Sequence, residues 1–433
     1  MAGLGRGANI ELTGRDLELV AAYKFSGYVS EAMNPFDLNM RHLRALSAVV
    51  ARGSLNRAAE AVGLSQPALT QGLGKLERQL GVALFDRRPD GVTPTQAGAA
   101  LAERIDRAFA YLVGATRRRT HGGRGFSCPE WLMTATQLGA FLHFCNAQSF
   151  VGAAGLSGAS QPAVHRAVRD LEQICGTPLV ERRGRGVVLT PPGRAMARGV
   201  RLAAAEIAAG IAEARGDDAD VGRIAIGAMP LSRALVLPHA LSAFLEVAPG
   251  TILDVIEGSW RELIEPLLDG VIDLTIGALR ENPPAGIEQE PLFTDQLAIF
   301  GRAGHPLTLH RSPGLDLLGR QQWIIGPSGT PLRSHWESLF EGRALPEVPV
   351  ECGSVMVIRG LLARSDLLTL LSPDQVALEI EASMLCRVGE PLDGALRTIG
   401  ISTRANWRPT ARQRQLVDLI RSAATETRIP EIQ

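Results

Sequence analysis

The side chains best suited to recognition chemistry occur in two matching sets, 95 positions apart. Each set opens with Ser-Gln-Pro-Ala, continues with hydrogen-bonding or basic residues and ends with two adjacent arginines. Amide and guanidinium groups pair with the edges of nucleic-acid bases, and arginine also binds phosphate. The candidate contact residues are Ser65, Gln66, Pro67, Thr70, Gln71, Arg87 and Arg88 in the first set, and Ser160, Gln161, Pro162, His165, Arg166, Arg169, Arg182 and Arg183 in the second.

The two sets lie inside an internal repeat. Residues 43–102 and 138–197 align without a gap, and 22 of the 60 positions are identical. A solenoid needs at least three stacked repeats, so two copies indicate a tandem duplication. The element that positions the first set of side chains is therefore expected twice.

The pattern of each copy predicts short helices followed by a two-stranded hairpin. In the first copy, Ser54 is the expected N-cap of a helix that Gly63 ends. Ser65 begins the next helix, with Pro67 in its first turn, where a missing N–H costs nothing. A Pro-Asp-Gly turn at 89–91 then joins two short strands, and the first strand carries the arginine pair.

Two short helices joined by a tight glycine turn, with a basic hairpin after them, predict a winged helix-turn-helix. Such a module places the N-terminus of its recognition helix in the major groove, where its free N–H groups also favour phosphate. The wing arginines can reach phosphates or the minor groove. The alternative is a small helical bundle with solvated arginines. Two copies in net-basic segments favour DNA binding.

The charge distribution supports this division. The 433 residues carry 45 basic and 45 acidic side chains, and an evenly spread neutral charge would argue against a polyanionic partner. However, residues 36–123 carry a net charge of +6 and residues 124–215 one of +4, against −9 for residues 216–433. The basic surplus therefore coincides with the repeat. We expect a cytoplasmic protein without membrane contact, because the sequence has no long apolar run, no signal peptide and only scattered cysteines.

From Val221 onward, strands alternate with helices, which predicts a largely parallel sheet. Ligands in such folds bind where strand ends meet helix N-termini, and hydroxyls and free N–H groups there suit a carboxylate or a sugar-related metabolite. The alternative is that these residues are only helix caps and turns. The candidate effector-binding residues are Pro230, Ser232, Ser259, Ser328, Thr330 and Ser354.

Both copies resemble the DNA-binding domain of LysR-type transcriptional regulators. The resemblance rests on Ser-Gln-Pro-Ala, Leu-Glu, Gly-x-x-Leu-x-x-Arg and Thr-x-x-Gly, each present twice in this order. The C-terminal half resembles the effector domain of the same family in the segments 244–249, 268–274 and 304–307. One DNA-binding domain per chain is usual in this family, so the tandem arrangement is a departure.

The resemblance implies an α+β and α/β multidomain fold. Its partners would be double-stranded promoter DNA, a small-molecule effector, RNA polymerase and further copies of the chain, and it implies no cofactor, no metal and no catalytic residue. The expected parts are an N-terminal extension (1–35), winged helix-turn-helix copies (36–95 and 136–190), linker helices (96–123 and 191–216), a connector (124–135), a periplasmic-binding-protein-like effector domain with subdomain I (221–301 and 394–423) and subdomain II (302–393), and a tail (424–433).

The two linker helices lead to a further expectation. In the family this helix pairs antiparallel with a partner in a dimer, so two of them in one chain could pair with each other and form an internal pseudo-dimer. The alternative is that each packs on its own domain. We also expect unequal copies: Gly72 and Gly74 weaken the first recognition helix, whereas Arg166 and Arg169 give the second better base-reading chemistry.

Two other function classes remain as alternatives. One is a solute-binding or sensor protein without DNA-directed activity, and the other is an enzyme built on the α/β half. The sequence has no nucleophile elbow, phosphate-binding loop or dinucleotide fingerprint, and its histidines show no metal-binding spacing. Salt-sensitive retention on DNA separates the regulator from both alternatives.

Overall fold

The computed structural model describes residues 33–88, 91–117, 126, 128–184, 186–216, 222–230, 236–392 and 395–426. Residues 1–32 of the expected extension, most of the Arg117–Gly123 segment and the tail from 427 lie outside this set. The chain divides into two compact units, Met1–Val221 and Gly222–Gln433.

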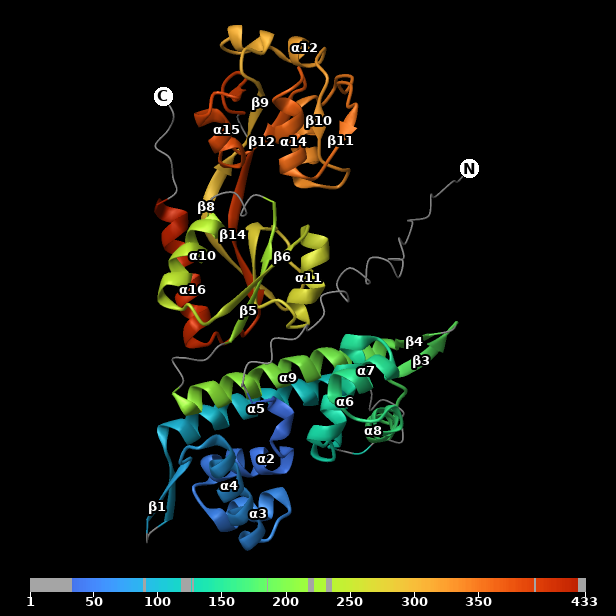
Figure 1. The fold of residues 1–433 in the computed structure, drawn as a ribbon, viewed down its shortest axis with the longest axis vertical. Coiled ribbons are helices and arrows are strands. Elements are labelled where there is room, and N and C mark those ends of the chain that lie inside the picture. Colours follow the sequence, from blue (N-terminus) through green and yellow to red (C-terminus); the bar gives the residue numbers. More distant parts are fainter. Residues whose placement is uncertain are drawn as a thin grey trace. The chain divides into compact units, whose positions relative to one another are not determined.

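The N-terminal unit contains the same succession of elements twice (Figure 1). Copy one holds η1 (Pro35–Asp37), α2 (Met40–Arg52), α3 (Leu55–Val62), α4 (Gln66–Leu80), β1 (Phe85–Arg88), β2 (Gly91–Pro94) and α5 (Gln96–Arg117). Copy two holds η2 (Pro129–Trp131), α6 (Ala135–Ala147), α7 (Phe150–Ser157), α8 (Gln161–Cys175), β3 (Val180–Arg183), β4 (Gly186–Leu189) and α9 (Pro191–Arg215).

The turns before the recognition helices follow from local chemistry. Gly63 and Gly158 end α3 and α7 at φ of 65° and 67°, in the left-handed region that favours glycine. The hydroxyls of Ser65 and Ser160 then accept hydrogen bonds from the N–H groups of Ala68 and Ala163, both at 3.4 Å. The expected caps and breaks of this segment are confirmed in both copies.

The helices α5 and α9 pack against each other along their lengths, which confirms the expected pairing within one chain (Figure 1). They run antiparallel: Leu101 and Arg104 lie beside Gly210, and Ala115 lies beside Gly199. A Cβ on Gly199 would lie 2.6 Å from the Cβ of Ala115, so the glycine is what permits this close approach. Residues of both copies consequently form one hydrophobic core.

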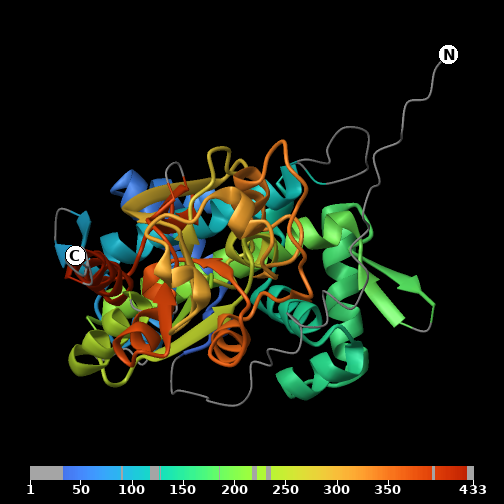
Figure 2. The ribbon, with the colours of Figure 1, turned by 90° about the horizontal axis from the view of Figure 1, so that it is seen from above.

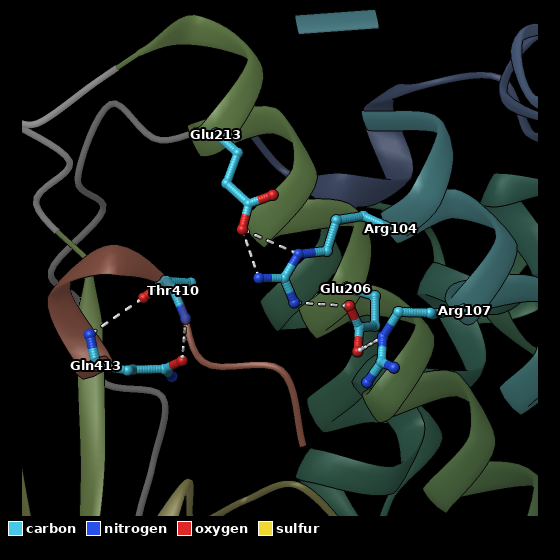
Figure 3. Close-up of polar contacts among 6 residues, drawn as sticks. All are labelled: Arg104, Arg107, Glu206, Glu213, Thr410 and Gln413. Carbon is cyan, nitrogen blue, oxygen red and sulfur yellow. Dashed lines mark hydrogen bonds and ion pairs between the residues drawn. The ribbon is translucent and has the colours of Figure 1, made fainter. Parts of the chain in front are cut away.

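An ionic network crosses this helix pair (Figure 3). The Arg104 side chain is 1% exposed and donates to Glu206 Oε2 at 2.9 Å and, from Nε, to Glu213 Oε1 at 3.1 Å. Arg107 donates to the other oxygen of Glu206, also at 2.9 Å. Both cations come from α5 and both carboxylates from α9, so the network joins copy one to copy two.

Smaller contacts between the copies are reciprocal. The turn η1, at the start of copy one, packs on α6 and α9, and η2, at the start of copy two, packs on α5. From α2, Arg44 donates to the carbonyl of Trp131 at 3.1 Å and lies over its ring. These matching contacts indicate that an approximate two-fold axis relates the copies.

Subdomain I of the C-terminal unit is built on a five-stranded sheet of order β6-β5-β7-β14-β8. Its strands β5, β6 and β7 are parallel, whereas β14 is antiparallel to both neighbours, so the sheet is mixed and the expectation of a largely parallel sheet was only partly right. The elements are β5 (Arg223–Ala228), α10 (Val236–Val247), β6 (Ile252–Glu257), α11 (Trp260–Leu268), β7 (Leu274–Ala278), β8 (Ile287–Gln296), β14 (Leu396–Arg404) and α16 (Ala411–Glu426).

The last of these helices has a well-defined start. At the start of α16, Thr410 and Gln413 form reciprocal capping hydrogen bonds (Figure 3).

Subdomain II begins at β9, which pairs antiparallel with β12 and β13. The strand β8 ends at Gln296 in subdomain I, whereas β9 belongs to the second sheet and begins ahead of the expected boundary at 301. The remaining elements are β9 (Ala298–Arg302), η3 (Pro306–Leu309), α12 (Leu315–Leu318), β10 (Ile324–Ile325), α13 (Pro331–Leu339), β11 (Val350–Glu351), α14 (Val355–Leu362), β12 (Thr369–Leu371), η4 (Pro373–Val376), α15 (Ala377–Glu381) and β13 (Leu385–Arg387).

The α5–α9 network yields a stability prediction. Replacing Arg104 (Arg104→Ala) leaves the buried Glu206 with only one cation, and we expect the free energy of unfolding of the N-terminal unit to fall by about 3 kcal/mol. Replacing the more exposed Arg107 (Arg107→Ala) should cost about 1 kcal/mol or less. Urea unfolding followed by circular dichroism measures both values. Equal losses of unfolding free energy in the two variants would show that the burial of Arg104 does not make its ion pairs more important for stability.

Candidate nucleic-acid interface and ligand cleft

The N-termini of the two recognition helices present the same surface. Gln66, Pro67 and Ala68 of α4 are exposed, and so are their counterparts Gln161, Pro162 and Ala163 of α8. The capping serine satisfies one backbone N–H in each first turn, and the remaining helix dipole favours an anion at that end. Both helix ends therefore suit a phosphate in the same way.

One turn further along, the two helices differ. Thr70 and Gln71 of α4 correspond to His165 and Arg166 of α8, and Gly74 corresponds to Arg169. Gln71 and Arg166 are exposed, as a base-reading side chain must be. The ring of His165 lies against Phe150, with 5.0 Å between ring centroids, which restricts its orientation.

Gly72 has a packing role that the sequence did not reveal. A Cβ at this position of α4 would lie 2.7 Å from the His42 ring of α2, so the glycine lets the two helices approach. Gly74 has only the end of the Arg78 side chain nearby, at 3.6 Å. The expected weakening of α4 by glycine therefore has a compensating contact at Gly72.

The two hairpins lie at opposite ends of the α5–α9 pair and project away from it (Figures 1 and 2). Arg182 and Arg183 are exposed on β3. Arg87 and Arg88 occupy the matching positions of β1, opposite Val92 and Gly91, but their side chains lie outside the described set. Each hairpin thus carries its arginine pair beside the turn.

The remaining shared motif residues hold the hairpin in place. Glu77 and Glu172 each accept hydrogen bonds from two successive N–H groups at the start of their hairpin, such as Leu84 at 2.9 Å and Leu179 at 2.8 Å. Thr95 and Thr190 donate to carbonyls just before the first strand, each at 2.8 Å. Much of the repeated motif therefore positions the reading surface without being part of it.

Three of the candidate effector residues in the C-terminal unit are helix N-caps. Ser259, Thr330 and Ser354 precede α11, α13 and α14. The hydroxyl of Thr330 accepts from Arg333 N–H at 3.4 Å and donates to the Pro327 carbonyl at 2.8 Å. These capping bonds agree with the alternative hypothesis that these residues are only helix caps and turns. Pro230 follows β5 and is half-buried, Ser328 is exposed, and Ser232 lies outside the described residues.

A basic pair that no sequence motif predicts lies beside these caps. Arg261 is exposed in the first turn of α11, and Arg280 follows β7 with its guanidinium 5.7 Å from the Trp260 ring centroid. Burial and the charge of Arg261 lower the pKa of Arg280. The Nε of Arg280 is buried and has no hydrogen-bond partner among the described residues. No sequence motif links the two arginines, because the fold brings them together.

This basic pair lies where the two subdomains approach each other. A Cβ on Gly329 of subdomain II would lie 3.8 Å from the Nη2 atom of Arg261 in subdomain I. The subdomains are also joined by the buried Asp295, which accepts from Ser372 and from Arg397, both at 2.6 Å. The caps at Ser259 and Thr330 flank the same region, so a ligand here would contact both subdomains.

Comparison with known proteins identifies the domains. Residues 40–99 and 135–194 both match the family described as bacterial regulatory helix-turn-helix protein, lysR family, and residues 217–425 match the LysR substrate binding domain. The chain is 32% identical to the HTH-type transcriptional regulator GalR of Pseudomonas putida over 399 residues, which cover 90% of this chain and 98% of that protein.

The chain belongs to the LysR family of transcriptional regulators. It is a transcriptional regulator, not an enzyme, with a helix-turn-helix DNA-binding part and an effector-binding part.

Solved structures of LysR-type proteins share the fold. Full-length OxyR from Pseudomonas aeruginosa, in variant form, has a TM-score of 0.54 and 24% identity, and covers 67% of this chain and 95% of its own. ArgP from Mycobacterium tuberculosis has a TM-score of 0.56 and 18% identity, with 67% and 96% covered. About a third of this LysR-type chain is thus left unmatched in each case. In the part of the chain that the structure describes, no helix is long and apolar enough to cross a membrane.

The junction of wing and linker helix yields a prediction. A Cβ on Gly98 would lie 2.0 Å from the Leu84 carbonyl oxygen, and one on Gly193 would lie 1.9 Å from that of Leu179. The substitutions Gly98→Ala and Gly193→Ala should each destabilise the unit by about 1–3 kcal/mol and weaken DNA binding. In the control Gly114→Ala, the added Cβ meets nothing within 4 Å beyond the backbone of its own helix turn, so this substitution should be neutral or stabilising by up to about 1 kcal/mol. Thermal denaturation distinguishes these outcomes, and equal effects at all three sites would refute the steric explanation.

Proposed function

We propose that a single chain supplies both DNA-reading modules of a ligand-responsive regulator. The observation that carries this proposal is the pairing of α5 with α9 inside one chain, which joins the two copies through a common core. In LysR-type regulators, as the resemblance implies, the linker helix of one chain pairs with that of a second chain. Here the duplication provides both partners, so one chain holds two recognition helices and two wings.

Each proposed contact residue has a distinct role. Ser65, Gln66, Pro67 and their counterparts Ser160, Gln161 and Pro162 fix the helix ends at the groove edge, next to phosphates. Gln71 and Arg166 read base edges, supported by Thr70, His165 and Arg169. The wing arginines Arg87, Arg88, Arg182 and Arg183 bind phosphates or the minor groove. The net charge of +6 and +4 on the two copies supports this assignment.

The proposed effector is a small carboxylate that binds between the subdomains of residues 221–423. Arg261 and Arg280 supply two cations, and among the described residues no carboxylate pairs with either guanidinium. Ser328 and the helix N-termini behind Ser259, Thr330 and Ser354, together with Pro230 and Ser232, complete the proposed lining. Bound effector would change how the subdomains pack and thereby the contact with RNA polymerase. We further propose that the protein acts in the cytoplasm as a homo-oligomer.

The DNA assignment predicts the salt dependence of binding. The variant that combines Arg182→Ala with Arg183→Ala should reduce the slope of log affinity against log salt by about 2, since each phosphate contact contributes about 0.9. Fluorescence anisotropy on promoter DNA between about 50 and 200 mM salt measures this slope. Replacement of the exposed Arg320 (Arg320→Ala) in the C-terminal unit is the matched control and should leave it unchanged. A wild-type chain that DNA does not retain would favour the solute-binding alternative.

The effector assignment predicts a charge requirement. Among small mono- and dicarboxylates and neutral sugars, we expect at least one carboxylate to raise the melting temperature of the C-terminal unit, by several degrees at a concentration 100 times its Kd. The substitution Arg280→Met should abolish the shift, and Arg311→Met, at a 95% exposed side chain, should preserve it. A shift produced by a neutral sugar alone, and kept in Arg280→Met, would overturn the carboxylate assignment.

A further inference from the structure

We infer that the DNA element bound by one chain consists of two half-sites that point in opposite directions and differ in base sequence. The inference rests on the proposed function and specifies its DNA partner. A homodimer presents two identical recognition helices and therefore favours a palindromic operator. The two recognition helices of this chain are not identical, although their framework is.

The opposite orientation follows from the way the copies are joined. The helices α5 and α9 are antiparallel, with Leu101 beside Gly210 at one end and Ala115 beside Gly199 towards the other. The contacts of η1 with α6 and α9 and those of η2 with α5 match this arrangement. An approximate two-fold rotation therefore relates α8 to α4, as it relates the two recognition helices of a symmetric dimer. The two helices therefore address half-sites in inverted orientation.

The framework around each recognition helix is shared. Both helices begin with an exposed Gln-Pro-Ala run behind a capping serine, and both hold their wing through a glutamate, Glu77 in copy one and Glu172 in copy two. Equal capping and equal wing attachment place both helices in the groove in the same way. The half-sites consequently share their phosphate geometry.

The base-reading positions differ in hydrogen-bonding chemistry. Gln71 can pair with the N6 and N7 atoms of adenine, whereas Arg166 at the matching position can pair with O6 and N7 of guanine. Gly74 offers no side chain where Arg169 is 66% exposed. The half-site under α4 is therefore centred on adenine and the one under α8 on guanine.

The contacts between α5 and α9 also disfavour symmetric pairing between two chains, in which α5 would pack on α5 or α9 on α9. At the 95-residue offset, the counterpart of Arg104 is Gly199 and that of Glu206 is Tyr111. If α5 paired with α5 of another chain, Arg104 would face Tyr111 in place of Glu206. If α9 paired with α9, Glu206 would face Gly199. Either arrangement buries a charge without its partner, which is strongly unfavourable, so the unlike helices pair and keep the unlike reading surfaces together.

Selection of bound duplexes from a randomised DNA pool by the full chain, followed by sequencing, tests the inference. The wild-type protein should enrich inverted pairs of unlike half-sites at a fixed spacing. Replacing the adenine under Gln71 by guanine should weaken binding about ten- to hundredfold. The variant that combines Thr70→His, Gln71→Arg and Gly74→Arg gives copy one the base-reading residues of copy two and should instead enrich a palindrome. The converse variant, which combines His165→Thr, Arg166→Gln and Arg169→Gly, should enrich a palindrome centred on adenine.

The outcomes are separable from failure of the proposed function. Enrichment of like half-sites by the wild-type chain would overturn the inference and leave DNA binding intact. The same change in both half-sites with Arg166→Gln would also overturn it. Absence of any enriched sequence, with folded protein by circular dichroism, would overturn the proposed function together with the inference.

Discussion

The burial of Arg104 between α5 and α9 constrains the whole N-terminal unit. A cation removed from water is tolerated only where carboxylates replace its hydration, and Glu206 and Glu213 on α9 do so. With Gly199 and Gly210, which allow the two backbones to approach, this network makes the helix pair a contact between unlike partners. The positions of both recognition helices and both wings depend on that contact.

The residues that carry the family resemblance mostly build the framework. Glu77, Thr95 and Gly98, with their counterparts in copy two, tie each wing to its recognition helix and linker helix. They are identical in the two copies because the framework is identical. The residues that we propose to read bases precede the glutamate in each copy, and they have diverged: Thr70 and Gln71 correspond to His165 and Arg166. In the proposed function, one chain therefore combines a shared scaffold with two different reading surfaces.

The N-terminal fold was largely predictable from sequence because its determinants are local. The caps at Ser65 and Ser160 and the breaks at Gly63 and Gly158 lie within a few residues of the elements they define. The long strands β8 and β14 were missed, since their stability comes from pairing more than a hundred residues apart along much of their length. The pair Arg261 and Arg280 and the contact of Gly72 with His42 depend on tertiary packing in the same way. The neutral net charge of the whole chain argued against DNA binding until the charges were counted by segment, because the basic residues 36–215 and the acidic residues 216–433 cancel.

Complementation between chains tests the central claim that one chain holds a complete reading pair. One variant would carry Thr70→Glu with Gln71→Glu, and the other would carry His165→Glu with Arg166→Glu, so that each retains one working recognition helix. The two are co-expressed, and their affinity for an operator with a single pair of half-sites is measured by fluorescence anisotropy. If the copies pair within one chain, the mixture binds no more tightly than the better variant alone. Recovery of wild-type affinity in the mixture would show that the reading pair forms between chains and would contradict the account.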